Sequence, residues 1–291
     1  EMERLQRREE GVSGQEDRSI TEKTKATLTV DDYFPRKTYR KEGDTVPLSY
    51  PLNFEMNNPR FEDNNRIGVE FSCHFKSSDG EIIEGISNPE SVEIDRREFS
   101  TTVLCESQEE FEGTVTLVQQ ALIKNMNTWT KLPKIIVGQK DNAWMEEWTQ
   151  RIISAHCQGG CVSLAPAEFA TLNFAFGRSL RDPILRAGDT YFFAATVEKG
   201  PMPGEIVRIN EYEIDLGPLN SYVNPPSALR GTNIEADDGE MVYLVRATLD
   251  DLPEEYKDLG DDYLYREFIG KINYDFLLEK EERGLEVEGV S

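Results

Sequence analysis

Apolar and polar residues alternate most regularly between Gly204 and Pro218. The apolar positions are Tyr212, Ile214 and Leu216, and the acidic positions that alternate with them are Glu211, Glu213 and Asp215. Alternation with a period of two is typical of an antiparallel strand with one buried face. A Pro-Gly pair precedes this stretch and a Gly-Pro pair ends it, so its boundaries are also marked. The pattern predicts a half-buried strand with an acidic outer face.

Weaker alternation of the same kind predicts further strands. Ile67–Phe75 and Ile82–Ile86 form a predicted hairpin, with Ser78-Asp79-Gly80 as its turn. Other strands are predicted at Ser91–Ile94, Phe99–Cys105, Gly113–Ile123, Lys134–Val137, Cys161–Leu164, Ala170–Phe176, Asp189–Val197, Glu205–Leu216 and Met241–Leu249. Val115, Leu117 and Gln119 are expected to share one face of their strand. Short strands separated by Gly, Asn or Pro favour an antiparallel sandwich or barrel.

Three segments have a helical pattern instead. Apolar residues recur at helical spacing in Asp141–Ala155, namely at Trp144, Trp148, Ile152 and Ala155. The pattern predicts an amphipathic helix inserted between strands. Tyr263–Ile269 and Ile272–Glu282 are also interpreted as helices, both of them acidic.

The first sixty residues lack regular alternation. Residues 1–24 are polar, whereas residues 25–60 are punctuated by proline and carry spaced apolar anchors, of which Tyr33, Phe34, Leu52 and Phe54 stand out. This pattern fits an extended arm that lies against its own domain or against a neighbour. We therefore expect an N-terminal arm (1–60), a β-sandwich core (61–220) and an acidic C-terminal extension with a strand and helices (221–291).

Composition restricts the function classes. The 291 residues have a formal net charge of −23, and residues 235–291 contribute 18 acidic against 6 basic side chains. Such a chain repels nucleic acid over most of its surface. Hydrophobic content of 38% and aromatic content of 10% suffice for a folded core. No apolar run is long enough to span a membrane.

Cysteine and histidine are scarce, which limits the chemistry. Four cysteines are too few for a disulfide scaffold, so reduced thiols in an intracellular setting are the default expectation. His156, Cys157 and Cys161 could supply half of a zinc site, with Cys73, His74 and Cys105 as the other half. The simpler interpretation is two buried thiols beside a Gly-Gly turn. His74 is interpreted as an exposed strand residue, and His156 as a helix-end residue that interacts with the dipole.

Adjacent carboxylates suggest another kind of site. Asp237 and Asp238, in the sequence EADDGE, are candidates for calcium, which binds oxygen ligands. Such pairs more often mark solvated turns. No other cofactor is expected, and no catalytic motif of the nucleophile-elbow, zincin or phosphate-loop type occurs.

Aromatic residues could line a ligand pocket, although core packing is the simpler interpretation. They are Trp129, Trp144, Trp148, Phe174, Phe176, Tyr191, Phe192 and Phe193.

The stretch from Ala187 to Pro218 (AGDTYFFAATVEKGPMPGEIVRINEYEIDLGP) resembles the last strands of single jelly-roll coat proteins of small icosahedral viruses. The matching positions of the closing strand are Gly204, Ile206, Tyr212, Ile214, Leu216 and Pro218. The resemblance covers about 30 residues. It implies a jelly-roll sandwich and a capsid protein that forms an icosahedral shell with itself and with other capsid subunits. Calcium at subunit interfaces is compatible with it.

The resemblance also implies a location, in the virion and in the host cytoplasm during assembly, with no membrane partner. Coat proteins of this group commonly carry an Arg-rich arm, but Arg4, Arg7 and Arg8 are diluted here by acidic neighbours. Genome contact would then be weak, or would need a basic segment before Glu1. Two rival hypotheses are a non-catalytic β-sandwich that binds carbohydrate or protein, and an enzyme of the cupin kind. Two histidines are too few for the metal site that the enzyme would need, so we expect a protein without enzymatic activity.

Overall fold

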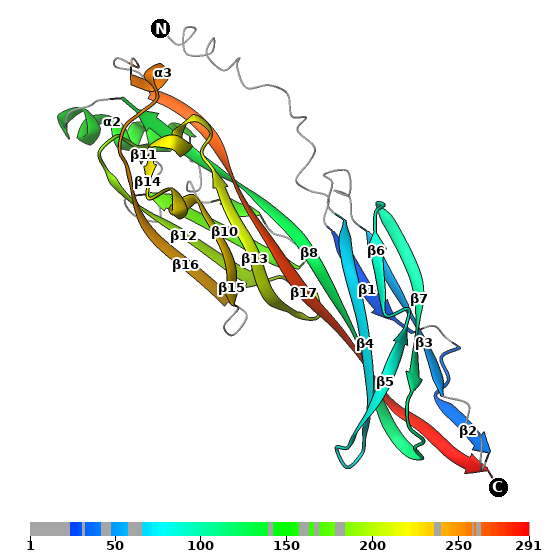
Figure 1. The fold of residues 1–291 in the computed structure, drawn as a ribbon. Helices are drawn as coiled ribbons and strands as arrows, with labels where there is room; N and C mark the ends of the chain where they lie inside the picture. The colour runs from blue at the N-terminus through cyan, green and yellow to red at the C-terminus, as the bar shows by residue number, and fades with distance from the viewer. Residues whose placement is uncertain are drawn as a thin grey trace.

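The computed structural model describes residues 24–30, 33–41, 48–57, 66–138, 142–156, 163–165, 169–177, 184–235, 240–257, 259 and 263–290. These residues form a mainly β protein with two large sheets whose strands are mostly antiparallel, as the alternation predicts. Two strands are far longer than the rest, β8 (Gly113–Val137) and β17 (Tyr263–Val290). They pair with each other along most of the elongated molecule (Figure 1), and we call them the spine.

The other elements flank the spine. Before α2 the strands are β1 (Lys25–Thr29), β2 (Lys37–Lys41), β3 (Ser49–Asn57), β4 (Ile67–Ser77), β5 (Ile82–Asn88), β6 (Ser91–Ile94) and β7 (Glu98–Ser107). After it they are β9 (Ser163–Ala165), β10 (Ala170–Gly177), β11 (Ile184–Leu185), β12 (Thr190–Lys199), β13 (Glu205–Asp215), β14 (Val223–Asn224), β15 (Arg230–Glu235) and β16 (Glu240–Leu249). The helices are α2 (Asn142–His156), α3 (Glu254–Lys257) and the 3₁₀ turns η3 (Gly217–Tyr222) and η4 (Pro226–Leu229).

One half of the molecule, which we call the disulfide region, contains β1 to β7 with residues 113–124 of β8 and 276–290 of β17. Its strands follow the order β1-β3-β7-β5-β4-β8-β17. Although β3 and β4 are not neighbours in this order, Phe54 of β3 and Phe71 of β4 have ring centroids 5.3 Å apart. The sheet therefore folds over on itself and forms two layers around a core.

The other half, the helix region, contains β9 to β16, α2 and α3 with residues 125–137 of β8 and 263–275 of β17. Here the second sheet, in the order β14-β16-β12-β10-β9, packs on the layer formed by the spine, β13 and β15. One hydrophobic cluster extends through both regions, from Phe54 and Val69 to Tyr191 and Phe193. The two regions are thus parts of one body with a shared core.

The C-terminal segment is the main correction to the sequence analysis. The two helices predicted at Tyr263–Ile269 and Ile272–Glu282 are absent, because these residues belong to β17. Phe268, Ile272, Tyr274, Phe276 and Leu278 are buried, with exposed or half-buried residues between them. Pairing with β8 on one side and β13 on the other outweighs the helical propensity of the charged residues.

Other predictions differ in length rather than in type. The hairpin of β4 and β5 is confirmed, and a helix is present at Asn142–His156. Gly113–Ile123 and Lys134–Val137, predicted as separate strands, are parts of β8. Between these two parts, β8 shifts its register against β17, and Asn125 has a positive φ of 60°. The strand is thus bulged at this point and not interrupted.

Candidate functional site

The predicted arm anchors lie mostly in the chain's own core. Phe34, Leu52 and Phe54 are buried, whereas Tyr33 is 93% exposed. Strand β3, which carries Leu52 and Phe54, pairs with both β1 and β7. Strand β3 of this segment is therefore part of the chain's own sheet.

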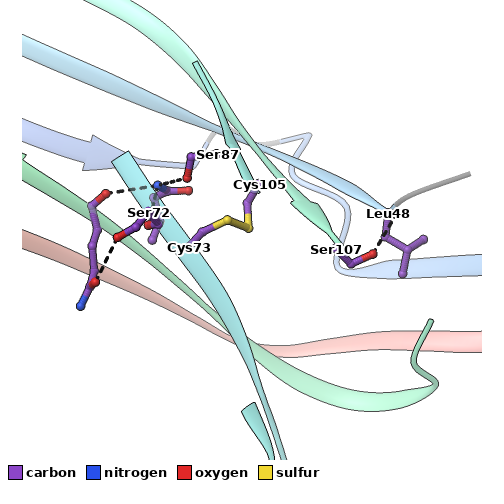
Figure 2. The surroundings of a disulfide bond; sticks show 8 residues. Leu48, Ser72, Cys73, Ser87, Cys105 and Ser107 are labelled. Atoms are coloured by element: carbon purple, nitrogen blue, oxygen red, sulfur yellow. Dashed lines mark hydrogen bonds between the residues drawn. A yellow bond between two sulfur atoms is a disulfide. The ribbon is translucent and has the colours of Figure 1, made fainter. Parts of the chain in front are cut away.

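A disulfide bond joins Cys73 of β4 to Cys105 of β7 (Figure 2). This corrects the expectation of reduced thiols and removes both residues from any zinc site. Strands β3 and β7 are neighbours in one layer, and β4 belongs to the other. The bond therefore joins the two layers, and beside it Tyr50 of β3 also contacts Phe75 of β4, with ring centroids 5.6 Å apart. Scattered spacing concealed the pair, because only folding brings residues 32 positions apart to a Cα–Cα distance of 6.0 Å.

Gly85 of β5 lies directly against this bond. Residues 82–85 of β5 pair with β4 and residues 85–88 pair with β7, so the strand passes from one layer to the other at Gly85. A Cβ atom at this position would lie 2.7 Å from Sγ of Cys73 and 2.9 Å from Sγ of Cys105. Only glycine leaves room for the disulfide, which explains why the apolar alternation of β5 is interrupted here.

A polar layer accompanies the disulfide inside the core. Gln119 of β8 is 0% exposed, and its Nε2 donates to the carbonyl of Ser72 (3.0 Å), to the carbonyl of Gln120 (3.2 Å) and to Oγ of Ser87 (3.1 Å). Its burial agrees with the face that the sequence predicts for it. The layer lies between the shared cluster and a second apolar cluster at the end of the disulfide region, which contains Phe75 and Leu285.

The acidic row of the best-patterned strand faces outward on β13, and its charge is partly neutralised within the chain. Arg230 of β15 forms ion pairs with Glu211 (3.3 Å) and Glu213. The hydrogen bond to Glu213 is the main cause that raises the pKa of Arg230. Asp215 instead accepts hydrogen bonds from the backbone of Gly217 and from Nδ2 of Asn220 (both 2.8 Å). Asp215 thus caps the turn that follows the strand, and Arg230 supplies a positive charge beside the two glutamates.

Comparison with known proteins assigns no relationship: no protein-family model matches the chain, and no curated protein matches it.

The aromatic residues expected in the core divide into two groups. Tyr191 and Phe193 are buried, whereas Trp148 and Phe192 are each 38% exposed. On α2, the rings of Trp144 and Trp148 stack at 6.1 Å, and Arg151 lies 5.3 Å from the centroid of Trp148. Because the two neighbours lie on the same helix, they explain the exposed tryptophan without a ligand.

The remaining candidates do not converge. Asp237, Asp238, Cys157 and Cys161 lie outside the described residues. His74 is half-buried on β4 and pairs in register with Glu84 and Val118. Where the structure describes the chain, no three His, Cys, Asp or Glu side chains cluster as a metal site would require, and no helix is long and apolar enough to cross a membrane.

Sequence reasoning missed one polar cluster, where the spine passes between the two regions. Asn210 donates to Oδ1 of Asn273 (2.9 Å) and of Asp275 (2.8 Å), and Asn273 donates to Oδ1 of Asn127 (3.1 Å). The backbone N–H of Asn125 also donates to Asp275 (3.0 Å). These bonds link β8, β17 and β13 at their register shifts, so the cluster stabilises the bulged segment.

Proposed function

We propose that the protein is a non-catalytic structural and binding module, a rigid β rod that acts in an oxidising compartment. The observation that carries this proposal is the spine. Two paired strands of 25 and 28 residues run through both regions and share one hydrophobic core with them. At about 3.3 Å per residue, 28 residues extend over roughly 90 Å. A rod of this kind holds groups bound at its two ends at a fixed separation.

The disulfide supports the proposed compartment. Cys73 and Cys105 are both buried, and their bond joins the two layers of one region. Disulfides of this structural kind persist in secreted, periplasmic or lumenal proteins and are rare in the cytosol. Protein and carbohydrate are the ligands expected from the sequence for such a module, and the proposal is compatible with either.

The icosahedral shell remains the rival proposal. It rests on the resemblance of residues 187–218 to a closing jelly-roll strand. A jelly roll has eight strands in two Greek keys, whereas the described residues form sheets of twelve and five strands. The strand thought to close the roll, β13, lies between β17 and β15 inside its sheet. This strand order favours the rod over the shell.

Light scattering and small-angle X-ray scattering of the purified full chain test the proposal. The rod predicts a species near 33.2 kDa or a small multiple of it. For the monomer it predicts a radius of gyration well above the about 19 Å of a compact chain of this length. A multi-megadalton particle would support the shell instead, and a compact monomer would exclude both proposals.

A further inference from the structure

The carboxamide of Gln119 is only half satisfied in the oxidised protein. Its Nε2 has three acceptors within 3.2 Å, but its Oε1 is buried and has no hydrogen-bond partner. Exchanging the two atoms would place the oxygen against the carbonyl oxygens of Ser72 and Gln120, so these contacts fix the orientation. A buried acceptor without a donor is costly and rare in native proteins. Another state of the protein could supply the missing donor.

The cysteines are the closest candidates. Cys73 lies directly opposite Gln119 on the neighbouring strand, and Cys105 lies directly opposite Ser87. Directly opposite side chains on antiparallel strands have Cβ atoms about 4.5–5.5 Å apart. All four side chains are buried, and Oγ of Ser87 is already bonded to Nε2 of Gln119. In the disulfide neither sulfur carries a proton, so neither can donate.

We propose that Oε1 of Gln119 is the hydrogen-bond acceptor for the thiol of Cys73 in the reduced protein. The disulfide layer is thus a redox site with two folded states. A dithiol such as dithiothreitol supplies two electrons and two protons. The S–S bond breaks, Cys73 and Cys105 become thiols, and the dithiol becomes a cyclic disulfide. The new S–H group of Cys73 then donates to the oxygen that the oxidised state leaves without a partner.

This inference goes beyond the rod and does not depend on it. It predicts that the chain folds with reduced cysteines and is oxidised afterwards, with both thiols already held in place. Gly85 has the same role in both states, because it leaves space for two sulfur atoms whether or not they are bonded.

Denaturant unfolding of the full chain tests the proposal in four combinations: Gln119 or Gln119→Met, each oxidised or reduced by dithiothreitol. Cys157→Ser and Cys161→Ser form the common background, so that the reductant acts on one bond. Reduction increases the unfolding equilibrium constant in both proteins, because the cross-link is lost. We expect this increase to be about fivefold larger in Gln119→Met, which lacks the acceptor and therefore one hydrogen bond in the reduced state.

Gln120→Met is the matched control, because this half-buried neighbour bonds to Ser72 and Glu279 on the opposite face. Its increase on reduction should equal that of the parent protein. The same increase in Gln119→Met as in the parent would overturn the proposal.

A second measurement needs no variant of Gln119, in case Gln119→Met does not fold. The infrared S–H stretching band of Cys73 is obtained as the difference between the reduced parent protein and reduced Cys73→Ala. A shift to lower frequency than a free thiol shows the predicted hydrogen bond, and an unshifted band contradicts it. A crystal structure of the oxidised protein with an ordered water on Oε1 of Gln119 would also overturn the proposal, because the acceptor would then already be satisfied.

Discussion

The disulfide region and the helix region share the spine and one hydrophobic core, but their layers are joined in different ways. In the disulfide region a covalent bond links the layers, and β5 crosses between them at Gly85. In the helix region the shared hydrophobic cluster joins the layers, and the buried polar groups are tyrosine hydroxyls together with two threonines and a lysine of β8. The hydroxyl of Tyr191, for example, donates to the carbonyl of Arg186 at 2.8 Å.

The two regions therefore differ in their response to a reductant but not in their response to alkali. A reductant breaks the bond in the disulfide region, whereas alkali acts on both regions, because burial raises the pKa of Tyr50 in the disulfide region and of Tyr274 in the helix region. Since the core is continuous, damage to either region also lowers the stability of the other. Variants that separate these effects test the comparison most directly.

Gly85→Val is expected to have the largest effect. Its side chain would overlap both sulfur atoms of the disulfide, and the backbone of two paired strands prevents a compensating shift. We expect a loss of about 4 kcal/mol or more in the free energy of unfolding, together with free thiols in a thiol assay. Gly68→Ala is the control, because the nearest atom to its Cβ would be 3.9 Å away. A stable, fully oxidised Gly85→Val protein would show that β5 does not cross beneath the bond.

Phe54→Ala tests whether the segment of β3 belongs to the core. The ring is fully buried and packs on Phe71 at 5.3 Å and on Phe99 at 6.4 Å. Its removal should cost about 3–5 kcal/mol in thermal or denaturant unfolding. Tyr33→Ala, at an exposed position of the same predicted arm, should change stability little. Equal and small effects of the two variants would restore the hypothesis of an arm that lies on a neighbour.

The double variant Cys73→Ala/Cys105→Ala should cost about 3–4 kcal/mol, because the bond closes a loop with a sequence separation of 32. Denaturant unfolding measures this loss, and the parent protein in a reductant should show a smaller one if Gln119 binds the thiol. A double variant as stable as the oxidised parent would mean that the bond does not stabilise the disulfide region.

The alkaline limb of the stability curve should depend on Tyr274, and this effect is the smallest. Burial raises the pKa of its phenol above the usual value of about 10. The unfolded chain therefore loses this proton first, so the contribution is complete below pH 10 and is lost as the pH rises from there towards the folded-state pKa. Tyr274→Phe should flatten the decline above pH 10 in thermal unfolding, and Tyr33→Phe should not. An unchanged slope in Tyr274→Phe would contradict this assignment.

Local pattern predicted the strands that alternate by themselves. The hairpin of β4 and β5 and the strand β13 are present because their period of two matches their burial. The same alternation is present in β17, where Phe268, Ile272 and Phe276 are buried on one face. The many charged residues of this segment led to the wrong prediction of helices instead of a strand. Its length depends on β8 and β13, which lie far away in the sequence.

The site could be predicted only in part. The burial of Gln119 followed from its alternation with Val115 and Leu117, but its partners on β4 and β5 did not. The disulfide needs β4 and β7 to face each other across Gly85, which no spacing rule encodes. The glycine that interrupts β5 was the one local signal of this crossing.

The central claim is that both regions form one rigid rod along a continuous spine, and hydrogen exchange along β17 tests it most directly. In the oxidised full chain, amides of residues 268–274 and of residues 276–282 should show the same high protection and lose it together as denaturant is added, because they belong to one cooperative unit. If protection changes abruptly at Asp275, and one half opens while the other stays protected, the spine is not continuous and the rod is two independent bodies.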